Sequence, residues 1–227
     1  MNSPGVGTLN EGPLHAGLKS WYHMPGDLVE QPLDGFVIDL VRGDHLIEIQ
    51  TRGFSAMRKK FDHLLDQHSI RLIHPVAEKR WVVKRDDDGN EISRRKSPKG
   101  GIAADVCSEL VSFPSLLSHP NFSLVVALTH EDEVRRPDPS RGWRKGGWVV
   151  DERRLIDVVD EIVFQSPQDL LQLLPAGLPD PFTTADLATG LNRTRHLAQE
   201  VAYCLKTAGA IEAVGRDRAG IQYRAAT

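Results

Sequence analysis

The chain has 227 residues and a mass of 25.2 kDa, a length that suits two domains of ordinary size. Its 40% hydrophobic and 26% charged content is typical of a folded globular protein and excludes a disordered one. Because 31 Asp and Glu outnumber 28 Lys and Arg, the whole chain lacks the basic excess that indicates a nucleic-acid-binding protein.

The sequence also bears on location. No apolar run approaches the ~18 residues that a membrane-spanning helix requires. Residues 1–13 have neither the basic nor the apolar region of a secretion signal. The two cysteines, Cys107 and Cys204, lack metal-ligand spacing, which argues against both a zinc site and a disulfide scaffold. We therefore expect a soluble, cytoplasmic protein with no membrane partner.

The first half is expected to mix helices and strands. A helix is predicted over 11–22, with Asn10 as its cap and Pro13 in its first turn. Two β-branched runs, 35–41 and 45–50, are separated by a short turn and predict a β-hairpin. The helical spacing of apolar residues over 54–67 predicts an amphipathic helix that packs on the sheet.

The following segments carry weaker signals. Strands are expected at 70–73, 80–83, 122–129 and 148–164, although 151–160 could equally be helical, and a helix that Pro114 disturbs is expected over 105–117. The segment 135–147 is rich in Pro, Gly, Arg and Trp and is expected to be irregular. The basic run 94–101 contains Pro and Gly, so we expect a loop there, which could simply be a solvated surface loop.

At Ser166 the pattern changes to short helices. Ser166, Pro167 and Asp169 provide a cap, a proline at the first helical position and an acidic third residue. Helices opening near 183 and 193 are followed by a hairpin of 210–214 with 221–224. This order is typical of a winged helix-turn-helix. We therefore predict a first domain of residues 1–165 and a winged helix of residues 166–227 that folds alone.

Two carboxylates of the predicted hairpin suggest chemistry. Glu48 and Gln50 are two apart on a strand and project from one face, and the tight turn brings Asp39 close to them. Ionised carboxylates in an apolar sheet repel each other unless a cation bridges them, and oxygen ligands suit Mg²⁺. The alternative is that Asp39 and Glu48 lie on the solvated face of an amphipathic hairpin.

The run Ile38-Asp39, then Glu48-Ile49-Gln50 before a helix, is similar to the core of the PD-(D/E)XK nuclease superfamily, which includes restriction endonucleases and Holliday-junction resolvases. The resemblance covers residues 10–75. It implies an α/β (α+β) restriction-endonuclease-like mixed sheet flanked by helices, and an endonuclease that hydrolyses DNA with Mg²⁺ or Mn²⁺. It further implies DNA repair, branched or structured DNA as a partner, and a homodimer.

The resemblance also assigns roles. Glu11 matches the accessory acid of the superfamily, while Asp39 and Glu48 match its catalytic metal ligands. Gln50 stands where the superfamily usually has lysine, and glutamine carries no charge to stabilise a transition state. Lys59 or Lys60 on the following helix could supply that charge, or each could be part of a solvated helix face.

Two weaker candidates and an alternative function follow from the same region. Asp34 is expected to be a turn residue, and His15 could face the site or simply pack. The glutamine also allows a catalytically inactive nuclease-fold protein that binds DNA or acts in assembly. The joint presence of Glu11, Asp39 and Glu48 favours the enzyme.

Basic residues supply candidate DNA contacts. The segment 52–100 contains 13 Lys and Arg against 7 Asp and Glu, a net charge of +6. The start of the predicted recognition helix and the wing are also basic, although such modules can instead bind proteins or dimerise. The candidate DNA-binding residues are Arg52, Lys59, Lys60, Arg94, Arg95, Lys96, Lys99, Arg193, Arg195, Arg216 and Arg218.

Overall fold

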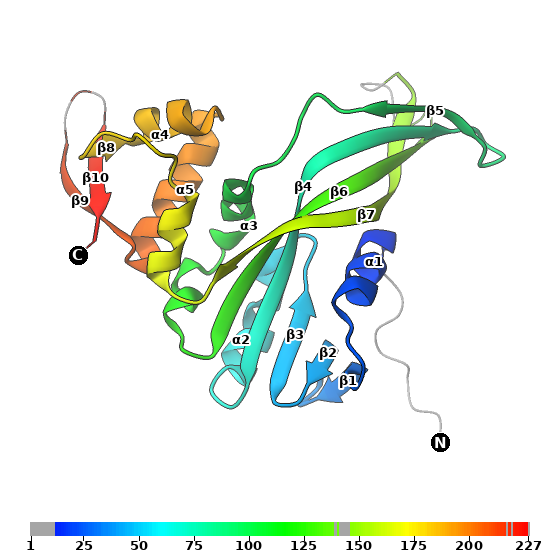
Figure 1. Cartoon of the computed structure of the whole chain (residues 1–227), viewed down its shortest axis with the longest axis horizontal. Coiled ribbons are helices and arrows are strands. Elements are labelled where there is room, and N and C mark those ends of the chain that lie inside the picture. The colour runs from blue at the N-terminus through cyan, green and yellow to red at the C-terminus, as the bar shows by residue number, and fades with distance from the viewer. Residues whose placement is uncertain (1–11, 139, 141–145, 217, 219, 227) are drawn as a thin grey trace. The chain divides into compact units, whose positions relative to one another are not determined.

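The computed structural model describes residues 12–138, 140, 146–216, 218 and 220–226 (Figure 1). Its strands form a seven-stranded sheet and a separate three-stranded sheet. Helices flank the large sheet, as the sequence predicts, so the mixed α and β fold class is confirmed. None of the helices in this part of the chain is long and apolar enough to cross a membrane.

The first helix, α1 (Pro13–Tyr22), follows Gly12 and has proline in its first turn, as expected. Its inward face carries the buried residues Leu14 and Leu18. The predicted cap Asn10 and the candidate acid Glu11 lie outside the described residues.

Three antiparallel strands follow α1. The strand β1 (Leu28–Leu33), which the sequence did not indicate, pairs with β2 (Phe36–Arg42), and β2 pairs with β3 (His45–Ile49). The predicted β2–β3 hairpin is therefore confirmed. Asp34 and Gly35 connect β1 to β2 with positive φ values of 49° and 84°, so Asp34 is a turn residue, as expected.

The strand β4 (Ser69–Arg85) is one continuous element, whereas the sequence predicted two shorter strands at 70–73 and 80–83. Pro75, which lacks a backbone donor, lies buried within the strand. The neighbours of β4 in the sheet, β3 and β6 (Phe122–Pro137), supply pairing along its length that local pattern could not reveal.

The basic run is not a loop at its start. Arg94, Arg95 and Lys96 lie in β5 (Glu91–Lys96), which pairs antiparallel with β4, so the prediction of a loop from residue 94 is wrong. The chain reverses over residues 86–90 instead, where Gly89 has a φ of 84°. Pairing with β4 satisfies the backbone groups of a segment whose side chains are all exposed.

The last two strands of the large sheet are long. β6 extends eight residues beyond the predicted end at residue 129, to Pro137, and so includes the start of the segment predicted to be irregular. β7 (Trp148–Phe164) is a strand throughout, so the helical alternative for 151–160 is wrong. Its many β-branched Val and Ile residues favour a strand.

Two segments predicted to be helical contain shorter helices than expected. The first is 54–67 and the second is 105–117. The first segment divides at Met57, and the second is interrupted before Pro114, as the sequence predicts. The elements are η1 (Phe54–Met57), α2 (Arg58–Leu64), η2 (Ala103–Val106), α3 (Cys107–Leu110) and η3 (Pro114–Ser118).

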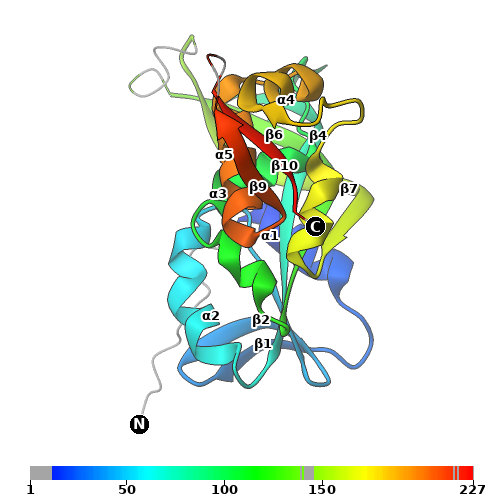
Figure 2. The same cartoon turned by 90° about the vertical axis from the view of Figure 1, so that its left-hand side faces the viewer.

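The C-terminal elements follow the predicted order (Figure 2). Thr183 caps a helix, with Asp186 completing the capping box, and Gly209 ends the next helix with a φ of 89°. The first turn of the segment is a 3-10 helix, with Ser166 and Asp169 forming its capping box. The elements are η5 (Pro167–Leu173), β8 (Phe182–Thr183), α4 (Thr184–Leu191), α5 (Arg195–Ala208), β9 (Ile211–Arg216) and β10 (Ile221–Ala225).

The chain divides into two compact units, each assembled from three separate segments. The first unit comprises Met1–Thr51, Pro75–Ile102 and Ala127–Glu161, and the second Arg52–His74, Ala103–Val126 and Ile162–Thr227. This division differs from the predicted boundary at residue 165, because the C-terminal elements group with earlier segments of the chain.

The second unit has an aromatic core. Phe54 stacks on Phe113 with ring centroids 5.3 Å apart, and Phe61 lies 5.5 Å from Phe122. In the same unit, α5 packs against α3 and η3. The thiol of Cys204 donates to the backbone carbonyl of Cys107 at 3.7 Å. A side-chain hydrogen bond with Cys204, together with burial, raises the pKa of the Cys107 thiol.

The first unit contains an ion pair with a consequence for acid stability. Arg42 donates from Nε and Nη2 to Asp27 at 2.9 and 2.8 Å, and the backbone N–H of Met24 donates to the same carboxylate. These bonds, with that from Arg42 the largest cause, lower the pKa of Asp27 from 3.8 to about 2.

The Asp27 carboxylate therefore contributes stability above pH 3.8 that is lost as the pH falls through about 2. We expect Asp27→Asn to flatten this dependence, so that the variant loses less stability than the wild type between pH 4 and pH 2. Urea unfolding across this range measures it, with Asp66→Asn at an exposed position as the control. Equal pH slopes for wild type and Asp27→Asn would contradict the assignment.

Candidate functional site

The structure brings Asp39 and Glu48 together. Leu40 pairs with Ile47 in the β2–β3 register, and continuing the register by one residue places Asp39 opposite Glu48. Directly opposed residues of an antiparallel pair project from the same face, with Cβ atoms ~5 Å apart. The hairpin thus presents two carboxylates side by side, and we call them the acidic pair.

The Asp39 carboxylate is held in place from two sides. The backbone N–H of Ile49 donates to its Oδ2 at 2.8 Å, and the Nε2 atom of His15 lies 3.3 Å from the same oxygen. The side chain of Asp39 is 17% exposed. A carboxylate restrained by a strand and a helix in this way is oriented before any ligand arrives.

Glu48 is more deeply buried and is only 3% exposed. The opposite face of the hairpin carries fully buried apolar residues, Ile38 and Leu40, while α1 packs against β3. The alternative that Asp39 and Glu48 lie on a solvated face is therefore wrong. Burial of a carboxylate is costly unless polar groups or a cation compensate it, so this position favours a role beyond solubility.

His15 belongs to the site, although the sequence left its role open. It lies on α1 one residue after the buried Leu14. The imidazole ring of His15 points toward Asp39 of β2. The sequence signal was only its spacing from Glu11, one helical turn earlier. The contact with Asp39 depends on how α1 packs, and sequence periodicity does not report that.

Gln50 follows the end of β3 and is partly exposed, so it adjoins the acidic pair in sequence but lies just beyond the strand. Lys59 and Lys60 lie in α2, where Lys59 is exposed and Lys60 half-buried. These two lysines belong to the second unit, whereas the acidic pair belongs to the first. Their role as a substitute for the usual lysine remains a prediction.

The donors of the acidic pair fit a hard cation. Mg²⁺ binds through one or two carboxylates and keeps several water ligands, which two adjacent carboxylates can satisfy. No group of three or more His, Cys, Asp or Glu side chains within the described ranges could hold a metal by protein ligands alone. A magnesium-type site with mostly water ligands is therefore the arrangement that Asp39 and Glu48 suit.

A metal at the acidic pair should stabilise the fold. We expect Mg²⁺ or Mn²⁺ to raise the melting temperature of the wild type, because an ion that binds only the folded state adds about 2.7 kcal/mol at a hundred times its Kd. Asp39→Asn should remove the rise, whereas Asp34→Asn in the β1–β2 turn should keep it. Differential scanning fluorimetry measures both, and an equal rise in the wild type and Asp39→Asn would place the metal elsewhere.

The basic candidates on β5 differ in their surroundings. Arg94 pairs with Asp132 at 2.9 Å and lies over the ring of Trp81, 5.0 Å from its centroid. Arg95 and Lys96 are exposed, and neither has an ion-pair partner in the part of the chain that is described. Lys99 follows the strand and is also exposed. Arg95, Lys96 and Lys99 are therefore available to phosphate, while Arg94 is already neutralised.

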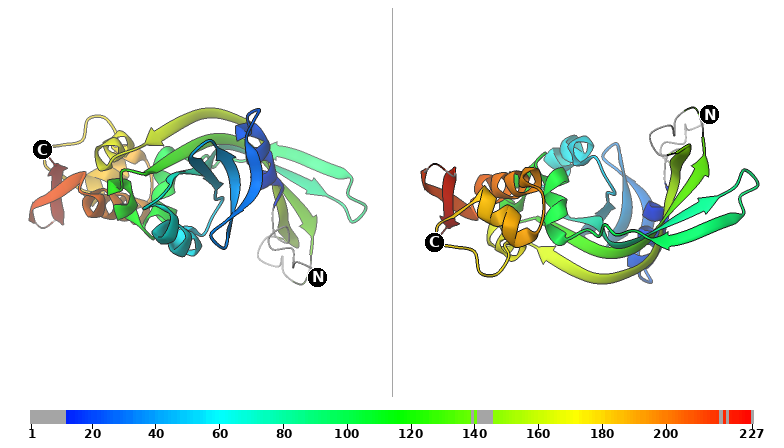
Figure 3. Two further views of the ribbon diagram at one scale, coloured as in Figure 1. Left: turned by 90° about the horizontal axis from the view of Figure 1, so that it is seen from below. Right: turned by 90° about the horizontal axis from the view of Figure 1, so that it is seen from above.

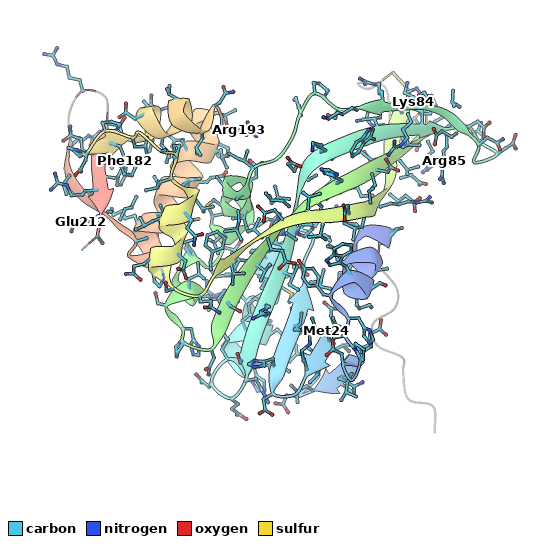
Figure 4. The ribbon with its side chains drawn as sticks, in the orientation of Figure 1. Met24, Lys84, Arg85, Phe182, Arg193 and Glu212 are labelled. Atoms are coloured by element: carbon cyan, nitrogen blue, oxygen red, sulfur yellow. The ribbon has the colours of Figure 1, made fainter. Side chains whose placement is uncertain are left out.

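Figure 4 shows two further basic side chains, Lys84 and Arg85, on β4 near β5. Lys84 lies 4.3 Å above the ring of Trp148. Arg85 has Glu152 at 4.0 Å. These two residues lie in the basic segment 52–100 but are not among the DNA contacts predicted from the sequence. Arg52, in contrast, lies in the second unit and is exposed.

The C-terminal candidates lie at the ends of elements. Arg193 is half-buried in the turn between α4 and α5 (Figure 4), where its guanidinium donates to the carbonyl of Asn192 at 3.2 Å. Arg195 is exposed at the first position of α5. Arg216 ends β9, and Arg218 lies in the β9–β10 turn; both are exposed.

A buried polar row on β6 was missed from the sequence. Glu131 and Glu133 are 2% and 5% exposed, and they project from the same face as the buried Thr129. The Thr129 hydroxyl donates to Glu131 at 2.8 Å, and Arg80 of β4 donates to Glu133 at 3.4 Å. The alternating acids were visible in the sequence, but such a pattern normally indicates a solvated strand face.

Comparison with known proteins shows where the chain belongs. Residues 12–165 match the family described as "Domain of unknown function (DUF8091)". The chain is a member of this family. It is also 31% identical over 185 residues to an "Uncharacterized protein" of Treponema pallidum (strain Nichols), covering 81% of this chain and 73% of that protein. No solved structure matches.

The DUF8091 match encloses the acidic pair and its surroundings. It begins at residue 12, just before α1, and ends at residue 165, just before η5. The basic residues of β5 fall inside the matched segment, whereas those of α5 and the β9–β10 hairpin lie beyond it. The DUF8091 part of the chain thus contains Asp39, Glu48 and Gln50 without the C-terminal elements.

Proposed function

We propose that this protein is a metal-dependent DNA endonuclease that hydrolyses phosphodiester bonds at the acidic pair. The observation that carries the proposal is the opposition of Asp39 and Glu48 on neighbouring strands. The order around them also supports it: after α1 and the added strand β1 come the strand with Asp39, the strand with Glu48, η1, α2 and β4. Apart from β1, this is the order of helix, Asp strand, Glu strand and helix that the PD-(D/E)XK resemblance implies.

Each residue has a role in this proposal. Asp39 and Glu48 hold Mg²⁺ or Mn²⁺, and the bound metal would polarise the phosphodiester and lower the pKa of a water molecule. The N–H of Ile49 and the ring of His15 fix the orientation of Asp39. The Gln50 amide would orient water through a hydrogen bond. It would not stabilise the transition state by charge, because the amide is neutral.

Basic side chains bind the DNA backbone in this proposal. Arg95, Lys96 and Lys99 are exposed and would neutralise phosphates, so binding should weaken steeply with salt. The C-terminal elements would act as a winged helix, with α5 as recognition helix and the β9–β10 hairpin as wing. The succession of α4, α5 and a hairpin bounded by β8 supports this assignment. A cytoplasmic location and a homodimer complete the proposal.

A second function is favoured by specific observations. Glu48 is almost completely buried, and Gln50 occupies the position where the resembled superfamily usually has lysine. A protein that kept the scaffold for DNA binding or assembly, without cleavage, would have these features. The basic surface residues support DNA binding in either case.

One experiment separates the two functions. The purified full-length chain is incubated with linear, nicked and branched DNA in the presence of Mg²⁺, Mn²⁺ or EDTA. The endonuclease proposal requires cleavage of at least one DNA with a metal and none with EDTA. Binding in gel-shift assays without cleavage under any condition supports the second function.

A further inference from the structure

The strand β7 ends the large sheet without a partner on its outer side. The strand order is β1-β2-β3-β4-β6-β7, and no strand within the described ranges pairs with the far edge of β7 (Figure 3). β7 is 17 residues long and contains neither proline nor a residue with positive φ. An edge of this length is a template for another strand.

The other edges of the sheet carry features that oppose such pairing. β1 contains Pro32, and Glu30 within it has a φ of 51°, which distorts the strand. β5 is only six residues long and presents three consecutive basic side chains. Short, charged or distorted edges resist edge-to-edge association. β7 is neither short nor distorted, and its charges are of both signs, so they can pair with a complementary strand.

The side chains of β7 indicate that a partner is missing. The strand contains nine apolar residues before its last position, and none of the nine is buried. Ile156 and Val159 are 45% and 40% exposed. The nine residues are Trp148, Val149, Val150, Leu155, Ile156, Val158, Val159, Ile162 and Val163.

The charges of β7 are also incompletely matched. In its first part, Asp151 pairs with Arg136, and Glu152 pairs with Arg154. Farther along, Asp157, Asp160 and Glu161 have no ion-pair partner among the residues that the structure describes, and the exposed Arg153 has only a longer-range attraction to Glu133. One basic and three acidic side chains thus remain available to a second surface.

We propose that β7 is the interface of a two-fold dimer, in which it pairs antiparallel with β7 of a second copy of this chain. A two-fold axis makes the interface self-complementary, so each contact occurs twice. In the register that places Asp157 opposite Asp157 of the partner, Arg153 faces Glu161 and Arg154 faces Asp160 of the partner. Shifting the strands by one or two residues either way leaves at least one arginine without a facing acid.

The same register matches the apolar side chains. Leu155 faces Val159 on one face of the two-strand ribbon, and Ile156 faces Val158 on the other, so the exposed Ile156 and Val159 gain apolar neighbours. Opposed residues of antiparallel strands lie on the same face, which gives each pair direct contact. We therefore assign a second copy as the partner, because β7 itself supplies both the charges and the apolar residues in the required order.

Asp157 lies on the two-fold axis in this register and faces Asp157 of the partner. Like charges in direct opposition destabilise a strand pair. The register therefore predicts a gain of affinity at one position. Asp157→Asn should tighten the dimer by about two- to five-fold, and because it strengthens association, misfolding cannot explain the result.

A charge exchange tests the register. Arg153→Glu and Glu161→Arg should each weaken the dimer by about ten-fold or more, because each places like charges opposite each other twice. The double variant should return to the wild-type dissociation constant. Arg71→Glu and Glu91→Arg, exposed positions on β4 and β5, are the matched controls and should change nothing. Sedimentation velocity over a concentration series measures each constant.

A wild-type chain that stays monomeric to its solubility limit would overturn the interface, as would a double variant no tighter than the single ones. If the two control variants also weakened the dimer, the effect would come from the net charge of the chain and not from the register. β7 would be the interface of the homodimer in the proposed function, and its pairing does not depend on catalysis. A dimer formed by a chain that cleaves no DNA would support this interface while rejecting the endonuclease.

Discussion

Glu48→Gln is expected to abolish metal-dependent cleavage while DNA binding is retained. The amide has the size of the carboxylate and fits the same buried position, but it cannot bind a hard cation with a full negative charge. Loss of one positioned electrostatic group typically lowers a rate by ~10²–10³, and loss of a metal ligand should lower it at least as much. Single-turnover cleavage and gel-shift affinity measure the two properties on the same DNA.

Two further variants sharpen this test. Gln50→Lys should retain cleavage and can increase its rate, because it adds the positive charge usual in the resembled superfamily. Asp66→Asn, at an exposed position outside the proposed site and DNA contacts, should behave like the wild type. Equal rates for Glu48→Gln and the wild type would exclude the acidic pair as the catalytic site. A wild type and a Gln50→Lys variant that both bind but never cut would leave the non-catalytic function.

Leu205→Ala is expected to lower the free energy of unfolding by about 2–5 kcal/mol, the usual cost of emptying a buried leucine position. Leu205 is completely buried in α5, and α5 packs against α3 and η3. The variant should therefore loosen these earlier segments as well as the C-terminal one. Urea unfolding measures the first effect, and hydrogen exchange of peptides from 103–118 measures the second.

Lys206→Ala is the matched control, since the adjacent side chain is exposed on the same helix. It should change neither the unfolding energy nor the exchange of residues 103–118. Faster exchange confined to 166–227 in Leu205→Ala would favour the domain boundary predicted at residue 165. Faster exchange in both segments would favour the division into two units seen in the structure.

The sequence by itself determined the features that depend on close neighbours in the chain. The turn after Arg42 predicted the β2–β3 hairpin, because two-residue turns have strong local preferences. Thr183 with Asp186, and Gly209, marked helix ends through hydrogen bonds and a backbone angle that involve only nearby residues. The proximity of Asp39 and Glu48 followed from the same hairpin.

Only the tertiary structure decided the features whose partners lie far along the chain. The ring of His15 reaches Asp39, 24 residues later, and Cys204 meets Cys107 across 97 residues. The same holds for β5, which is a strand because β4 pairs with it, and for the burial of Glu48 beside α1. Local pattern reports backbone preference and amphipathicity, whereas these contacts arise from packing between elements, which no short stretch of sequence encodes.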